Sequence, residues 1–172
     1  MVNVKDRIER AVSECLHAVG ITPENCSYGI YTCRGSKAEG PGVYVFFDDK
    51  KVYYVGESND LKSRVFKEHC GAQIGESEGV VRFLMYFLEE ICEKKGEWSG
   101  HDVKDREESV KEFLREKIGR MEIYVVTCPE LGNISKENQK NKNETRVKLE
   151  KCLIKELRPV LNPDKKSTVT GS

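Results

Sequence analysis

Residues 42–56 read Gly-Val-Tyr-Val-Phe-Phe-Asp-Asp-Lys-Lys-Val-Tyr-Tyr-Val-Gly. Two runs of β-branched and aromatic residues, Val43 to Phe47 and Lys51 to Val55, flank the polar segment Asp48-Asp49-Lys50. Such runs favour strands, and a short polar connection between them favours a tight turn. The stretch therefore predicts an antiparallel β-hairpin.

The segments around the hairpin predict further helices and strands. Asn59 or Asp60 can cap a helix that follows the hairpin directly. Apolar residues at helical spacing predict helices over Val4 to Val19, Leu61 to His69, Val80 to Lys94, Val103 to Ile118 and Thr145 to Leu157. Two more strands are expected over Ser27 to Cys33 and Glu122 to Thr127, and a polar loop over Gly132 to Asn143.

Length and composition indicate a single soluble domain, residues 1–172. The chain has 172 residues, of which 38% are hydrophobic and 34% are charged, a composition typical of globular proteins that need no metal or disulfide to fold. No apolar run approaches the roughly 20 residues that a membrane helix requires. The charged stretch from Met1 to Glu14 does not resemble a secretory signal, so a cytoplasmic location is expected.

The seven cysteines favour reduced thiols over a metal site. They are scattered and odd in number, and they form no Cys-x-x-Cys pair. A zinc site requires clustered ligands, and the chain offers only three histidines. We therefore expect buried, reduced cysteines.

Charge is distributed unevenly although the net charge is +0. The segment from Glu76 to Lys117 has twelve acidic and eight basic residues, a net charge of −4. The segment from Lys136 to Lys166 has ten basic and five acidic residues, a net charge of +5. A basic face for nucleic acid and ordinary solvated helices explain this pattern equally well.

A group of side chains that suits a phosphodiester follows from the hairpin. Tyr44 and Tyr54 each belong to one strand, and Arg64 lies on the next predicted helix. A guanidinium matches phosphate oxygens and keeps its charge, while a phenol can position a water or accept its proton. Glu150 lies between Leu149 and Leu153 on the last helix, where it can bind a hard cation or simply lie at the helix boundary.

These residues resemble the GIY-YIG nuclease family. The resemblance rests on Gly42-Val43-Tyr44, on Tyr54-Val55-Gly56, and on Asn59-Asp60-Leu61 leading to Arg64. It also rests on the C-terminal run from Leu149 to Asn162, which is similar to a stretch of the bacterial excision-repair incision subunit. The matches cover residues 42–69 and 121–162, with an N-terminal extension over 1–41 and a helical insertion over 76–118.

The resemblance implies a fold and a role for each matching residue. The fold is α/β of the α+β type, a small antiparallel central sheet flanked by helices. Tyr44 would serve as or with the general base on the attacking water, and Tyr54 would help to position it. The remaining implied roles are phosphate binding by Arg64, binding of Mg²⁺ or Mn²⁺ by Glu150, and support of the site by Asn162.

The chain departs from the family pattern at three places. A literal Gly29-Ile30-Tyr31 lies too far from Tyr54 for a hairpin, so we interpret it as a chance match or a flanking strand. Family members often have a histidine one helical turn after the arginine, where this chain has Glu68, with His69 next. His69 is a candidate catalytic residue, although position +4 of an α-helix, here Glu68, shares the face of Arg64 better than position +5. The repair subunit has a lysine where this chain has Glu57, and Lys51 and Lys62 are the candidate substitutes.

The sequence thus predicts a magnesium-dependent DNA endonuclease, a stand-alone hydrolase of phosphodiester bonds of restriction or repair type. The alternative is a nucleic-acid or protein-binding module that keeps the fold without the activity. DNA is the expected partner, and no membrane is expected. The apolar stripe Val81, Leu84, Met85 and Leu88 predicts core packing first and a homodimer interface second.

Overall fold

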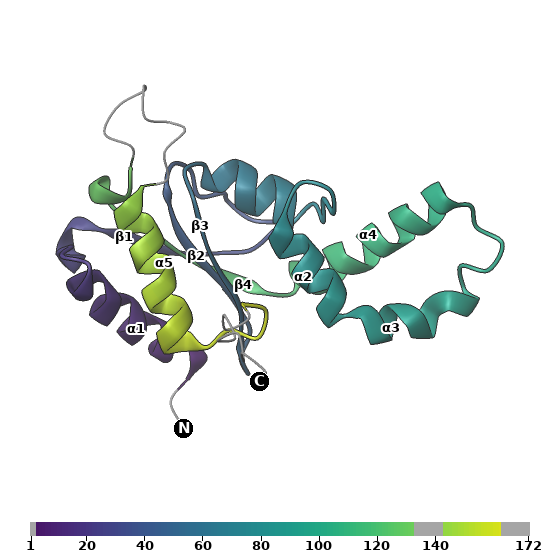
Figure 1. Cartoon of the computed structure of the whole chain (residues 1–172), viewed down its shortest axis with the longest axis horizontal. Coiled ribbons are helices and arrows are strands. Elements are labelled where there is room, and N and C mark those ends of the chain that lie inside the picture. The colour runs from purple at the N-terminus through teal and green to yellow at the C-terminus, as the bar shows by residue number, and fades with distance from the viewer. Residues whose placement is uncertain (1–2, 133–142, 163–172) are drawn as a thin grey trace, which may run out of the picture.

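The computed structural model describes residues 3–132 and 143–162 (Figure 1). It has an α+β fold with one antiparallel sheet in the order β1-β4-β2-β3. The strands are β1 (Ser27–Tyr31), β2 (Gly42–Phe47), β3 (Val52–Ser58) and β4 (Glu122–Thr127). The predicted hairpin is confirmed as β2 and β3, and its turn is held by Asp48, which accepts hydrogen bonds from the backbone of Lys50 and Lys51.

Helices cover both faces of this sheet. They are α1 (Val4–Ala18), η1 (Pro23–Asn25), η2 (Lys62–His69), α2 (Glu78–Tyr86), α3 (Leu88–Glu93), η3 (Lys94–Gly96), α4 (Val103–Gly119), η4 (Pro129–Leu131) and α5 (Glu144–Leu157). The helices expected over Val4 to Val19, Val103 to Ile118 and Thr145 to Leu157 agree closely with α1, α4 and α5. Residues 133–142 of the expected polar loop lie outside the described residues.

Two helix predictions need correction. The single helix expected over Val80 to Lys94 is divided at Phe87, where φ is −94° and ψ is 10°. Phe87 is buried, and its ring contacts Phe113 at 6.2 Å between centroids, so burial of this ring overrides the continuous helical pattern. The helix after the hairpin, η2, is a π-helix, whose hydrogen bonds join residues five apart.

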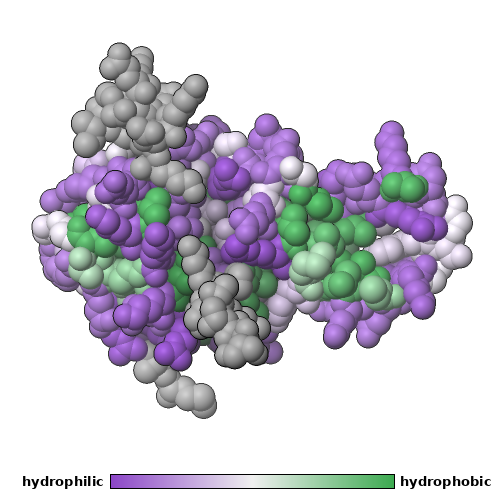
Figure 2. Space-filling model, in the orientation of Figure 1, coloured by the Kyte–Doolittle hydropathy of each residue, from purple (hydrophilic) through white to green (hydrophobic). Residues whose placement is uncertain are grey.

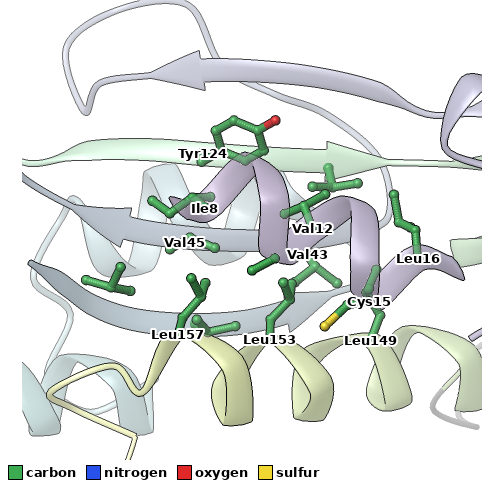
Figure 3. Packing of buried hydrophobic residues seen from close by; sticks show 14 of the residues in the cluster. Ile8, Val12, Cys15, Leu16, Val43, Val45, Tyr124, Leu149, Leu153 and Leu157 are labelled. Atoms are coloured by element: carbon green, nitrogen blue, oxygen red, sulfur yellow. The ribbon is translucent and has the colours of Figure 1, made fainter. Parts of the chain in front are cut away.

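The central strand β2 is buried on both faces. Its odd-numbered residues Val43, Val45 and Phe47 belong to the core under α1 and α5. Figure 3 shows how Ile8 and Val12 of α1 and Leu149, Leu153 and Leu157 of α5 converge on these valines. Its even-numbered residues Tyr44 and Phe46 belong to a second core under η2, α2 and α4. The alternation of a strand thus sends Tyr44 to the face opposite α1 and α5.

Six of the seven cysteines form disulfides, which contradicts the expectation of reduced thiols. Cys15–Cys152 joins α1 to α5, Cys26–Cys128 joins the residues that flank β1 and β4, and Cys33–Cys70 joins the segment after β1 to the end of η2. The partners are 137, 102 and 37 residues apart. The odd number of cysteines is explained by Cys92, which is exposed and unpaired within the described chain.

The insertion over residues 76–118 forms α2, α3 and α4, and the α3–α4 hairpin extends away from the sheet (Figure 1). Val81, Met85 and Leu88 are 37%, 56% and 42% exposed, so core packing is wrong for these three residues of the stripe. Leu84 is half-buried against the second core. Figure 2 shows hydrophobic side chains gathered over α2 and α3.

Within residues 3–132 and 143–162, none of the helices combines the length and the apolar character that a membrane span requires.

Candidate active site

The register of the hairpin brings the two motif tyrosines together. Tyr44 pairs with Gly56 and Phe46 pairs with Tyr54, so Tyr44 and Tyr54 are diagonal neighbours on one face of the sheet. Their ring centroids are 6.2 Å apart. Gly56 makes this possible, because a Cβ atom there would lie 2.5 Å from the Tyr44 hydroxyl oxygen. The glycine in the second motif therefore creates the space that the first tyrosine fills.

His69 contacts Tyr44 directly. The Tyr44 hydroxyl and His69 Nε2 form a hydrogen bond of 2.8 Å, and both residues are 1% exposed. The π-helix explains this contact, because the Cys70 N–H donates to the Val65 carbonyl five residues earlier. In such a helix position +5 lies about one turn beyond Arg64. His69 can therefore share the face of Arg64, although α-helical spacing would favour Glu68. Glu68, at +4, forms an ion pair of 2.6 Å with Arg64.

A serine completes a buried hydrogen-bonded chain. Ser77 Oγ lies 3.1 Å from His69 Nδ1, and its side chain makes no capping hydrogen bond to α2 although it is the N-cap residue. The chain Tyr44–His69–Ser77 is thus continuous and buried. Sequence reasoning missed Ser77, since a serine before a helix normally indicates only a cap.

Burial keeps the central pair neutral. Burial raises the pKa of Tyr44 well above 10, and the nearby Tyr54, Glu150 and Glu57 raise it further while Arg64 opposes them. Burial, together with the positive charge of Arg64, lowers the pKa of His69 to about 3. At neutral pH the pair therefore consists of a phenol and a neutral imidazole.

Charged side chains from several helices act on the pKa of Tyr54. Burial raises its pKa, Arg82 and Arg64 lower it, and the carboxylates of Glu150 and Glu78 raise it. Its ring is 5.7 Å from that of His69. Tyr54 is more accessible than Tyr44, which places it at the mouth of the group.

Glu150 reaches the same group from the other side of the sheet. It lies half-buried on α5, which packs against the edge strand β3. Its negative charge raises the pKa of both Tyr44 and Tyr54. The charges of Arg64 and Glu150 therefore both act on the two phenols, and Arg64 also acts on His69.

Asn162 supports the edge of the hairpin. Its Oδ1 accepts from the Val55 N–H at 2.8 Å, and its Nδ2 donates to the Val55 carbonyl at 2.9 Å. Val160 and Leu161 donate their N–H groups to the carbonyls of Val52 and Tyr53. Residues 160–162 therefore satisfy backbone hydrogen-bonding groups at the edge of β3 next to Tyr54. The contribution of Asn162 is thus structural.

The other candidate lysines and the Glu57 position have different partners. Lys51 Nζ donates to the Tyr86 hydroxyl, and Lys62 pairs with Glu39. Glu57 forms a 2.5 Å ion pair with the buried Arg146 of α5. Gly29-Ile30-Tyr31 belongs to β1, a flanking strand that is separated from β3 by two other strands.

In the described part of the chain, no three histidine, cysteine, aspartate or glutamate side chains gather in a group that could hold a metal ion. A magnesium ion usually keeps several waters and binds one or two carboxylates together with a substrate phosphate. The half-buried residue Glu150 supplies one such carboxylate, so it fits what a magnesium ion requires of the protein.

No family model, curated protein or solved structure matches this chain. Its function must therefore be argued from the site itself.

Proposed function

We propose that this protein is a magnesium-dependent DNA endonuclease of the GIY-YIG type. The observation that carries the proposal is the buried chain Tyr44–His69–Ser77, which lies beside Tyr54 and on which the charges of Arg64 and Glu150 act. The sequence motifs that resemble the family supply Tyr44, Tyr54, Arg64, Glu150 and Asn162 independently of these contacts. A purely structural cluster has no need for this combination of a guanidinium, two phenols and a carboxylate.

The hydrogen-bonded chain provides a route for a proton. In the tautomer with the proton on Nδ1, His69 donates to Ser77 Oγ and its Nε2 lone pair faces the Tyr44 hydroxyl. Tyr44 can then accept a proton from the attacking water while it passes its own proton to Nε2. The oxygen of the deprotonated water forms a bond to phosphorus, and the bond from phosphorus to the leaving oxygen breaks. The leaving oxygen keeps the electron pair of that bond and takes a proton from solvent water.

Arg64 and Tyr54 orient the substrate in this proposal. The Arg64 side chain is partly exposed and pairs with Glu68, so a phosphate oxygen can compete for its guanidinium. Tyr54, on which the charge of Arg64 acts, can hold the water or a phosphate oxygen. Glu150 would hold Mg²⁺, which supplies stabilisation of the negative charge that develops on the phosphate oxygens.

A plasmid assay tests the proposal. Purified protein is incubated with supercoiled plasmid and Mg²⁺, in parallel with Arg64→Ala and Glu150→Ala. We expect nicking or linearisation by the wild type and a loss of at least about a hundredfold in each variant. Arg120→Ala is the matched control, because Arg120 also pairs with a glutamate four residues away but lies outside this site.

The alternative function is a nucleic-acid or protein-binding module without activity. The nuclease proposal would be wrong if plasmid, branched DNA, damaged DNA and RNA all stayed intact after incubation with the wild type and each variant. That result would favour the binding module. Retained DNA binding without cleavage would identify the module as one for nucleic acid.

Location and assembly are part of the same proposal. A homodimer through the exposed stripe would supply two sites for cutting both strands. The cytoplasmic location expected from the sequence stays a prediction. Disulfides are typical of oxidising compartments, although intracellular proteins of hyperthermophiles also contain them.

A further inference from the structure

The insertion contributes one wall of the candidate active site. Gly79 of α2 faces the site so closely that a Cβ atom there would lie 2.7 Å from His69 Cε1 and 3.3 Å from Tyr54 Cζ. Phe83 contacts the rings of Phe46 and Tyr54 at 5.6 and 6.3 Å. The helix α2 therefore packs against His69 and Tyr54, so its other side chains can reach a molecule bound there.

Arg82 projects from this wall at the position of Tyr54. Its guanidinium carbon lies 5.9 Å from the Tyr54 ring centroid, and its side chain is 27% exposed. It donates to Glu78 at 2.5 Å and to the Leu161 carbonyl at 3.4 Å, the latter a long contact. Arg82 and Arg64 both lower the pKa of Tyr54, so two permanent cations from different helices act on this phenol.

Little free energy is lost when Arg82 exchanges its present contacts for a ligand. Glu78 is 79% exposed, and an exposed ion pair of this kind contributes little stability. A phosphate oxygen is a better partner for a guanidinium fork, because it accepts charge-assisted hydrogen bonds in matching geometry. Glu78 can turn into solvent when such a ligand arrives.

We infer that Arg82 is a second phosphate-binding residue, which holds the phosphodiester next to the one held by Arg64. The inference rests on the proposed function and adds a second contact to the same strand. It also gives the insertion a role in the site: α2 positions His69 through Ser77 and binds the substrate backbone through Arg82. Because the contact is to a phosphate, it raises affinity without selecting a base sequence.

A binding titration tests this inference. The dissociation constant of a fluorescent duplex is measured by anisotropy in the absence of Mg²⁺, at several salt concentrations, for wild type, Arg82→Gln and Arg82→Lys. We expect Arg82→Gln to weaken binding about tenfold and to reduce the slope of log K against log salt by about 0.9. Arg82→Lys keeps the charge, so it should keep the slope and lose only part of the affinity.

Arg120→Gln is the matched control, because it removes an arginine of the same charge and pairing from the exposed end of α4. Equal affinity and slope for wild type and Arg82→Gln would overturn this inference while leaving the nuclease proposal intact. If Arg82→Gln fails to fold, a wild-type affinity for Arg82→Lys would overturn it instead. A wild type that neither binds nor cleaves DNA overturns both proposals.

Discussion

Tyr44 fills a space that the chain keeps open with glycine. Its ring lies against the Cα atom of Gly56, and its hydroxyl meets His69. The glycine of the motif Tyr54-Val55-Gly56 is therefore needed for a steric reason, in addition to the chemical reason for the tyrosines. The tyrosine and the glycine must be considered as one unit across the two strands.

Gly56→Ala should disrupt this unit. The added methyl group would lie 2.5 Å from two atoms of the Tyr44 ring system, so the ring must move or the strands must separate. We expect a loss of about 1–3 kcal/mol in the free energy of unfolding and a displaced Tyr44–His69 hydrogen bond. Denaturant unfolding and the plasmid assay check this. The control is Gly119→Ala, whose Cβ meets nothing within 4 Å; equal effects of the two substitutions would contradict the steric argument.

His69 should make the fold sensitive to acid. Its pKa is about 3 in the folded protein and about 6.5 when exposed, so between these values the unfolded chain binds a proton that the folded chain does not. The stability that follows from the neutral histidine is complete above about pH 6.5 and is lost as the pH falls toward 3. The slope from this group is at most about 1.4 kcal/mol per pH unit.

Denaturant unfolding at several pH values checks this by comparing wild type with His69→Gln. We expect a shallower loss of stability on acidification for the variant, because it has no proton to take up on unfolding. The exposed His17 on α1 provides the control His17→Gln. Parallel pH dependences for wild type and His69→Gln would be evidence against a buried neutral histidine.

At the scale of elements, the disulfide Cys33–Cys70 holds the end of η2 next to the site. Cys70 directly follows His69, and its N–H closes the last π-type hydrogen bond of the helix. The disulfide therefore fixes the part of the helix that carries the Tyr44 partner. The disulfide Cys26–Cys128 lies at the far edge of the sheet, beside β1 and β4.

Removing these two disulfides should separate stability from activity. Cys26→Ser/Cys128→Ser opens the longer loop, 102 residues against 37, so chain entropy predicts a stability loss at least as large, about 3–5 kcal/mol. Cys33→Ser/Cys70→Ser should instead cause the larger loss of cleavage. Thermal unfolding and plasmid cleavage, measured below both melting temperatures, decide this. A greater activity loss in the Cys26/Cys128 variant would contradict the proposed role of Cys33–Cys70.

The elements were largely predictable, whereas three details of the site were not. Strands β2, β3 and β4 follow from local patterns of β-branched and aromatic residues, and the turn follows from Asp48. The disulfides depend on contacts between residues 37 to 137 positions apart, which no local spacing reveals. The π-helix has no compositional signature, and without it the contact of His69 could not be anticipated. Ser77 looked like an ordinary cap.

The whole molecule combines a compact sheet with a helical extension whose outer surface is partly apolar. Val81 and Met85 of α2 and Leu88 of α3 are exposed. Apolar groups on such a surface are stabilised by contact with a partner, and a second copy presents the same stripe. This stripe is the feature on which the proposed homodimer rests.

Met85→Glu should therefore produce a monomer. We expect the wild type to sediment as a dimer at micromolar concentration and the variant to sediment as half that mass, because a buried unpaired carboxylate is costly. Sedimentation velocity over a range of concentrations measures this. Val103→Glu, which changes an exposed apolar residue outside the stripe, is the control. A wild type that stays monomeric at the highest concentration would remove the dimer from the proposal.

The π-helix has a consequence for the spacing of the side chains that it carries. A π-helix is equivalent to an α-helix that has accepted one extra residue without losing the alignment of its ends. Arg64 and His69 are thus separated by one residue more than an α-helical turn requires, yet His69 still meets Tyr44. In an α-helix at this place, a histidine four residues after the arginine would take the position that His69 has in this chain.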